Sequence, residues 1–73
     1  MSTDRQAAVA RKGEVQAALG RLQRELAHAE AQAAALTGLR AKLAARRVSR
    51  LQAEADALMA EEARLRLLID RSK

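Results

Sequence analysis

Two heptad stripes run through the chain and constrain its fold more than any other feature. Residues that are mostly small or aliphatic recur at alternating steps of three and four from residue 5 to 36, and again from 41 to 72, with Arg5, Lys12 and Glu62 as the charged exceptions. Such a repeat places an apolar stripe along one side of an α-helix and is typical of coiled coils. The second stripe is one residue out of step with the first, so the phase changes between Leu36 and Val48. The pattern predicts an all-α protein with an interruption near its middle.

The larger members of both stripes are the expected core. They are Val15, Leu19, Leu22, Leu26 and Leu36 on the first stripe, and Val48, Leu51, Leu58, Leu65 and Ile69 on the second. The chain has no aromatic residue, cysteine or proline, and alanine alone supplies 19 of its 73 residues. The chain is therefore rich in strong helix formers and poor in large side chains, and this composition favours long helices over a compact globule.

Two local signals compete for the position of the interruption. Thr37-Gly38-Leu39 is typical of a helix C-terminus, with Gly38 left-handed and Leu39 folded back onto the preceding turn. Ser49 and Gln52 instead form a capping box, which marks a helix start. A start at Ser49 requires a stop within 44–47, where there is no helix breaker. The first signal is therefore favoured.

A chain reversal at Thr37-Gly38 brings the two stripes together. Residues whose numbers add to 77 then face each other, so that Leu26 meets Leu51 and every core layer meets a core position. We expect one unit, 1–73, folded as a two-helix antiparallel coiled-coil hairpin with helices over about 3–36 and 40–71 and a turn over about 37–39. The alternative is one continuous long helix in a dimeric coiled coil.

The charged residues within the stripes also favour the hairpin. In the hairpin, Lys12 and Glu62 occupy adjacent layers and have opposite signs. In a parallel dimer of continuous helices each would meet its own copy, and like charges at core positions are destabilising.

Small residues form a second stripe on nearly the opposite face of the first helix. Apart from Arg24, its members are Ala10, Gly13, Ala17, Gly20, Ala27, Ala31, Ala34 and Gly38, and the second helix has a comparable outer stripe of Ala53, Ala57, Ala60, Ala63 and Leu67. Faces of this kind let helices approach closely, which predicts a homodimer of hairpins forming a four-helix bundle. A different protein is an equally suitable occupant.

Basic residues concentrate in the middle of a chain whose net charge is +5. Between residues 31 and 53 there is no acidic residue, and the basic ones are Arg40, Lys42, Arg46, Arg47 and Arg50. We call these five the basic patch. It is either a solvated face or the binding surface for an anionic partner, namely nucleic acid, an acidic protein surface or an anionic membrane. Without aromatic side chains, any nucleic-acid contact would be to the phosphate backbone.

No residue pattern in the chain predicts catalysis, a cofactor or a metal. His28 is the only histidine, and its side chain and that of Glu30 point to different faces of a helix. No apolar run approaches the roughly 20 residues that span a bilayer, and the first residues contain no apolar signal-peptide segment, so we expect a cytoplasmic protein. The expected function is a non-enzymatic helical protein–protein interaction module, such as an adaptor, assembly factor or small chaperone, that self-associates. The alternative is a nucleic-acid-binding accessory protein that uses the basic patch.

Overall fold

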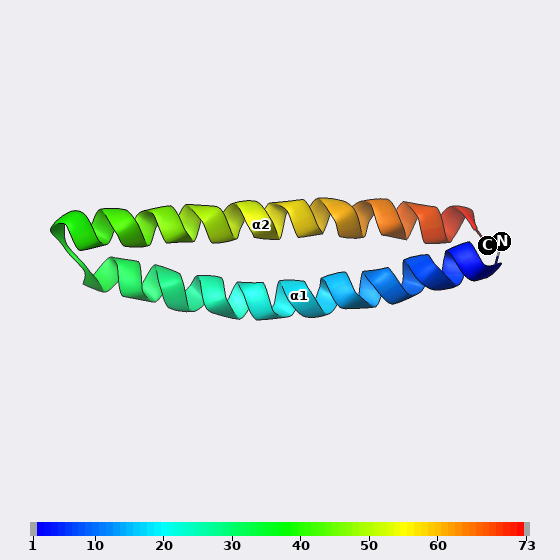
Figure 1. Ribbon diagram of the computed structural model, residues 1–73, viewed down its shortest axis with the longest axis horizontal. Helices are drawn as coiled ribbons and strands as arrows, with labels where there is room; N and C mark the ends of the chain where they lie inside the picture. The colour runs from blue at the N-terminus through cyan, green and yellow to red at the C-terminus, as the bar shows by residue number, and fades with distance from the viewer. Residues whose placement is uncertain (1, 73) are drawn as a thin grey trace.

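The chain forms a helical hairpin. The computed structural model describes residues 2–72, with side chains described from residue 4 onward. It contains α1 (Ser2–Ala35) and α2 (Gly38–Arg71), which pack side by side along their whole lengths. They run in opposite directions, so the start of α1 and the end of α2 lie at one end and the connection lies at the other (Figure 1). The molecule measures 55 × 14 × 13 Å. The predicted all-α hairpin is confirmed.

The core is a single seam between the two helices. Its buried members are Val15, Leu19, Leu22, Ala29, Leu51 and Ala55, and the partly buried Leu26, Val48, Leu58 and Leu65 pack against them. Val15 is the most enclosed, with 1% of its surface exposed. All of these residues belong to the two heptad stripes, because the stripe is the only face that each helix turns toward the other. Ile69, near the end of α2, is half-buried.

The prediction that Leu36 belongs to the core is wrong. α1 ends at Ala35, and the backbone N–H of Leu36 donates to the Ala33 carbonyl at 3.3 Å, which tightens the last turn. Leu36 therefore follows the helix instead of continuing its stripe, and 37% of its surface is exposed.

The connection is shorter than the sequence predicts, because α2 begins at Gly38 and only Leu36 and Thr37 lie between the helices. Gly38 has φ +64°, the left-handed conformation expected of it, but it is the first residue of α2. Thr37 precedes it in an extended conformation and makes no capping hydrogen bond through its side chain. Leu39 is 72% exposed, so it does not fold back on α1 as expected.

Candidate functional site

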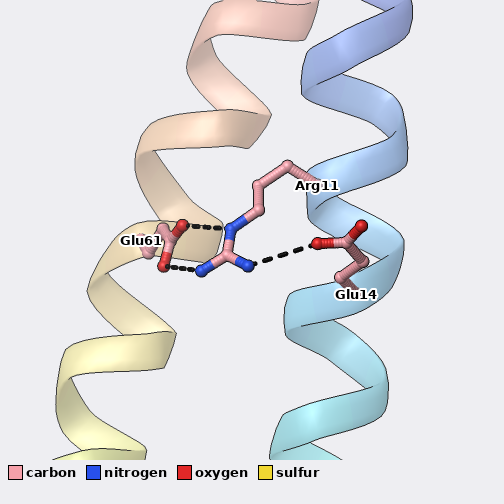
Figure 2. Close-up of polar contacts among 3 residues, drawn as sticks. All are labelled: Arg11, Glu14 and Glu61. Atoms are coloured by element: carbon pink, nitrogen blue, oxygen red, sulfur yellow. Dashed lines mark hydrogen bonds and ion pairs between the residues drawn. The ribbon is translucent and has the colours of Figure 1, made fainter.

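A forked ion pair joins the helices near their open end. Arg11 of α1 reaches across to Glu61 of α2, with Nε donating to Oε1 at 2.6 Å and Nη2 donating to Oε2 at 3.1 Å (Figure 2). Its third nitrogen, Nη1, donates to Glu14 on its own helix at 3.3 Å. The hydrogen bonds to Glu61 raise the pKa of the Arg11 guanidinium, and the same contact lowers the pKa of the Glu61 carboxyl.

A second interhelical pair lies closer to the connection, with a single hydrogen bond and with the arginine on α2. Arg47 Nη2 of α2 donates to Glu25 Oε1 of α1 at 3.2 Å. Both pairs join residues whose numbers add to 72, and they are two heptads apart on each helix, so they follow the same edge of the hairpin. Neither pair was predicted from the sequence. The signal for them is that Arg11 and Glu25 of α1 are 14 residues, or two heptads, apart, and that Arg47 and Glu61 of α2 have the same spacing.

The charged residues within the stripes are arranged differently. Glu62 accepts a hydrogen bond from Arg66 Nη2 at 2.7 Å, one turn along the same helix. Lys12 and Glu62 are both half-buried, and no ion pair joins them within the described residues. The opposite signs of the two residues therefore do not lead to a direct contact.

All five residues of the basic patch are exposed, and the structure divides them into two groups. Arg40 and Arg47, seven residues apart, lie on the edge of α2 that faces α1, and Arg47 is held there by Glu25. The other three, Lys42, Arg46 and Arg50, lie outside that edge. Within the part of the chain that the structure describes, Arg47 is the only one of the five in an ion pair.

A groove lies beside the connection, between the end of α1 and the start of α2. It has a volume of about 330 Å³, and its lining residues are Ala29, Gln32, Leu36, Arg40, Leu43, Ala44 and Arg47. We call it the tip groove. Leu43 is 54% exposed, and Leu36 also leaves more than a third of its surface uncovered. The groove therefore combines exposed leucine side chains with arginines at its margin.

Of the residues that line the tip groove, only Arg40 and Arg47 were predicted from the sequence to belong to a binding surface. Leu43 lies outside both heptad stripes, and an aliphatic side chain that a helix does not turn toward its partner remains exposed. Met59, Leu67 and Leu68, toward the other end of α2, also lie outside the heptad stripes and are exposed as well.

A second hollow lies on α1 near its start. It has a volume of about 410 Å³ and is lined by Arg5, Gln6, Val9 and Ala10. The Nε of Arg5 is shielded from solvent and has no hydrogen-bond partner among the described residues. Among the described residues, those that line this hollow all belong to α1.

The small-residue stripe of α1 faces away from α2. Its alanines are exposed, and a Cβ added at Gly13 would meet nothing within 4 Å. One added at Gly20 would lie 3.7 Å from Arg24 Nη1, which is ordinary van der Waals contact. The packing of α1 on α2 therefore does not require glycine at either position.

His28 is exposed, and the described residues contain no group of three or more His, Cys, Asp or Glu side chains that could hold a metal ion. Across residues 2–72, neither helix is both long enough and apolar enough to cross a membrane.

Comparison with known proteins assigns no role to any residue of the chain. No family model, no curated protein and no solved structure matches the chain. The surface features that the structure itself offers are the tip groove with its two arginines, the outward stripe of small residues, and the exposed aliphatic side chains.

Proposed function

We propose that this chain is a helical protein–protein interaction module that self-associates and acts as an adaptor, assembly factor or small chaperone. The observation that carries the proposal is the exposed area. A compact protein of 7.9 kDa exposes about 4,400 Å². The hairpin exposes 5496 Å², an excess of about 1,100 Å², which is similar to the roughly 800 Å² that each partner buries in a typical interface.

The chemistry of this surface supports the same proposal. Two helices bury only one seam between them, so aliphatic side chains on other faces stay in contact with water. The large exposed ones are Val9, Leu36, Leu39, Leu43, Met59, Leu67 and Leu68. Seven such side chains among the described residues favour a second layer of helices, because covering them removes apolar area from water.

We propose back-to-back packing of two hairpins through their small-residue stripes as the mode of self-association. Gly13 and Gly20 each cost the helix about 1 kcal/mol relative to alanine, and the hairpin itself offers no contact that compensates. Close approach of a second backbone would explain both positions. The product is a four-helix bundle, an arrangement that buries a face of each hairpin.

Sedimentation equilibrium over a range of concentrations tests the proposal. We expect twice the 7.9 kDa mass of the chain at high concentration. Ala17→Glu, on the small-residue stripe, should weaken association about tenfold or more, because it places a charge in the interface. Gln16→Glu adds the same side chain at the neighbouring exposed position and should have little effect. A mass of one chain at every concentration would rule out self-association.

Nucleic-acid binding is the second candidate, and it rests on the four exposed basic side chains of the patch that form no ion pair within the described residues. A salt titration separates the two functions. Binding to duplex DNA should weaken with a logarithmic slope of about 0.9 for each phosphate contacted. An apolar contact between helices should change little over the same range.

A further inference from the structure

We infer that the tip groove binds an acidic amphipathic helix of a partner protein. This inference rests on the proposed interaction function and adds to it the surface that is used and the chemistry of the partner. It draws on three features of the described residues: the exposed leucines, the position of the arginines, and the absence of acidic side chains from 31 to 53.

The apolar part of the groove comes from both helices. Ala29 of α1 and Ala44 of α2 are small residues of the core stripes, and they leave space between the helix ends. Leu36 and Leu43 line the same space with exposed surface. An aliphatic side chain of a partner helix placed there would remove its own surface and that of both leucines from water, which stabilises the contact.

The charged part of the groove selects the sign of the partner. Arg40 and Arg47 are seven residues apart, which on a helix means two turns along the same side. A partner helix lying along the groove presents side chains with that same spacing, so two of its carboxylates can face the two guanidinium groups. The first turn of α2 contains no acidic residue, and the helix dipole adds positive potential at that end.

Arg40 is the stronger candidate of the two for this contact. Within the described residues no carboxylate lies within 4 Å of it, whereas Glu25 already engages Arg47 at 3.2 Å. The Glu25–Arg47 pair is exposed on both sides, so the Arg47 guanidinium still has donors available to a second acceptor.

Phosphate backbone or an anionic membrane would fit this groove less well. Phosphates would satisfy the arginines but would leave Leu36 and Leu43 in contact with water. A membrane surface is broad, whereas the leucines and Arg40 are drawn together in a groove between two helices. An acidic helix covers the leucines and pairs with the arginines at the same time.

The test uses a synthetic three-heptad helical peptide with leucine on one face and glutamate along both margins of that face. A second peptide replaces every glutamate by lysine. Binding to the full chain is measured by fluorescence anisotropy, and NMR amide shifts map the contact. We expect the glutamate peptide to bind and to shift residues 29–47, and the lysine peptide not to bind. If the glutamate peptide fails to bind, or shifts residues elsewhere, the inference is wrong.

Two matched pairs of variants locate the site. Arg40→Glu should weaken binding of the glutamate peptide about tenfold or more, and Arg46→Glu, with the same change of charge outside the groove, should weaken it about twofold at most. Leu43→Ser should weaken binding, whereas Leu68→Ser, at a residue of similar exposure (49%) outside the groove and the small-residue stripes, should not. Circular dichroism of each variant checks that the helices are retained. Equal effects within either pair would contradict the assignment of the groove.

Competition separates the other anionic ligands and keeps the two proposals distinguishable. Short duplex DNA and vesicles of anionic lipid should displace the glutamate peptide poorly. Displacement by either one at lower concentration than the unlabelled peptide would overturn the inference in favour of that ligand. If the peptide does not bind but sedimentation shows a dimer, the inference fails while the proposed function stands. A chain that is monomeric and binds no helix would contradict both.

Discussion

At the scale of single residues, Gly38 and Gly13 affect the stability of the fold in opposite directions. Gly38 has φ +64°, a conformation that costs residues with a Cβ roughly 1–2 kcal/mol, and this backbone geometry lets α2 start directly after a connection of two residues. Gly13 lies inside a helix with open space around it. There glycine lowers stability and brings no benefit within the hairpin.

We therefore expect Gly38→Ala and Gly13→Ala to act in opposite directions. Gly38→Ala should lower the free energy of unfolding by about 1–2 kcal/mol, because alanine is strained in the left-handed region. Gly13→Ala should raise it by about 0.5–1 kcal/mol, because it removes the entropic cost of glycine in a helix. Urea unfolding followed by circular dichroism measures both, at a concentration where the chain is monomeric. A stabilising Gly38→Ala would mean that the connection has a different backbone.

At the scale of the helices, the interhelical ion pairs follow the heptad repeat along one edge. Arg11 pairs with Glu61 and Glu25 pairs with Arg47, and the position midway between them on α1 is Ala18, with Glu54 as the corresponding residue of α2. Ala18 is half-buried and Glu54 is exposed. At this heptad, the Glu54 carboxylate therefore faces alanine on α1 instead of a basic residue.

Ala18→Arg should complete this row. The new guanidinium would lie opposite Glu54 as Arg11 lies opposite Glu61, and an exposed pair of this kind contributes about 0.2–1 kcal/mol to the free energy of unfolding. Thermal unfolding at low salt provides the measurement. Ala18→Gln, which adds a long side chain without charge, is the control, and Ala18→Glu should be less stable than either. If arginine and glutamine have equal effects, the two residues do not face each other.

The Arg11–Glu61 pair predicts a dependence of stability on pH. The pKa of the Glu61 carboxyl in the folded state is below its ordinary value of 4.5, mainly because of the hydrogen bonds from Arg11. Its contribution to stability is therefore present above that value and is lost as the pH falls through the lower, folded-state pKa. Urea unfolding at a series of acidic pH values should show a shallower slope for Glu61→Gln than for the parent. Arg11→Gln should make the slope shallower to a similar extent. The double variant, Arg11→Gln with Glu61→Gln, should have the same slope as either single variant.

Much of the helix arrangement was predictable from the sequence, because each heptad stripe leaves few ways to bury its leucines. The packing of both stripes into one seam follows once the chain reverses near Gly38. The helix ends were less predictable, since Gly38 starts α2 instead of following the end of α1, and both Leu36 and Leu39 are exposed. The tip groove depends on those ends, so of its lining only Arg40 and Arg47 were singled out from the sequence as a binding surface.

At the scale of the whole molecule, the hairpin is one layer of two helices with different surfaces at its two ends. The connection end has the tip groove and the basic patch. Both ends of the described chain lie at the opposite, open end (Figure 1), and the Arg11–Glu61 pair lies near it. The small-residue stripe of α1 faces outward along the length between them. In the proposed assembly, one face pairs with a second copy while the tip remains free for another partner.

Every one of these surfaces depends on the chain folding back on itself in the observed register, so the most direct measurement is a distance within one chain. The sequence contains no cysteine, so cysteines introduced at the exposed positions Gln23 and Met59 can be spin-labelled specifically. Labelled protein is diluted with an excess of unlabelled protein, which removes distances between copies. In the hairpin the two backbones should lie within about 20 Å, since packed helix axes are roughly 10 Å apart. A distance of about 54 Å, from 36 residues at 1.5 Å each along one continuous helix, would contradict the hairpin.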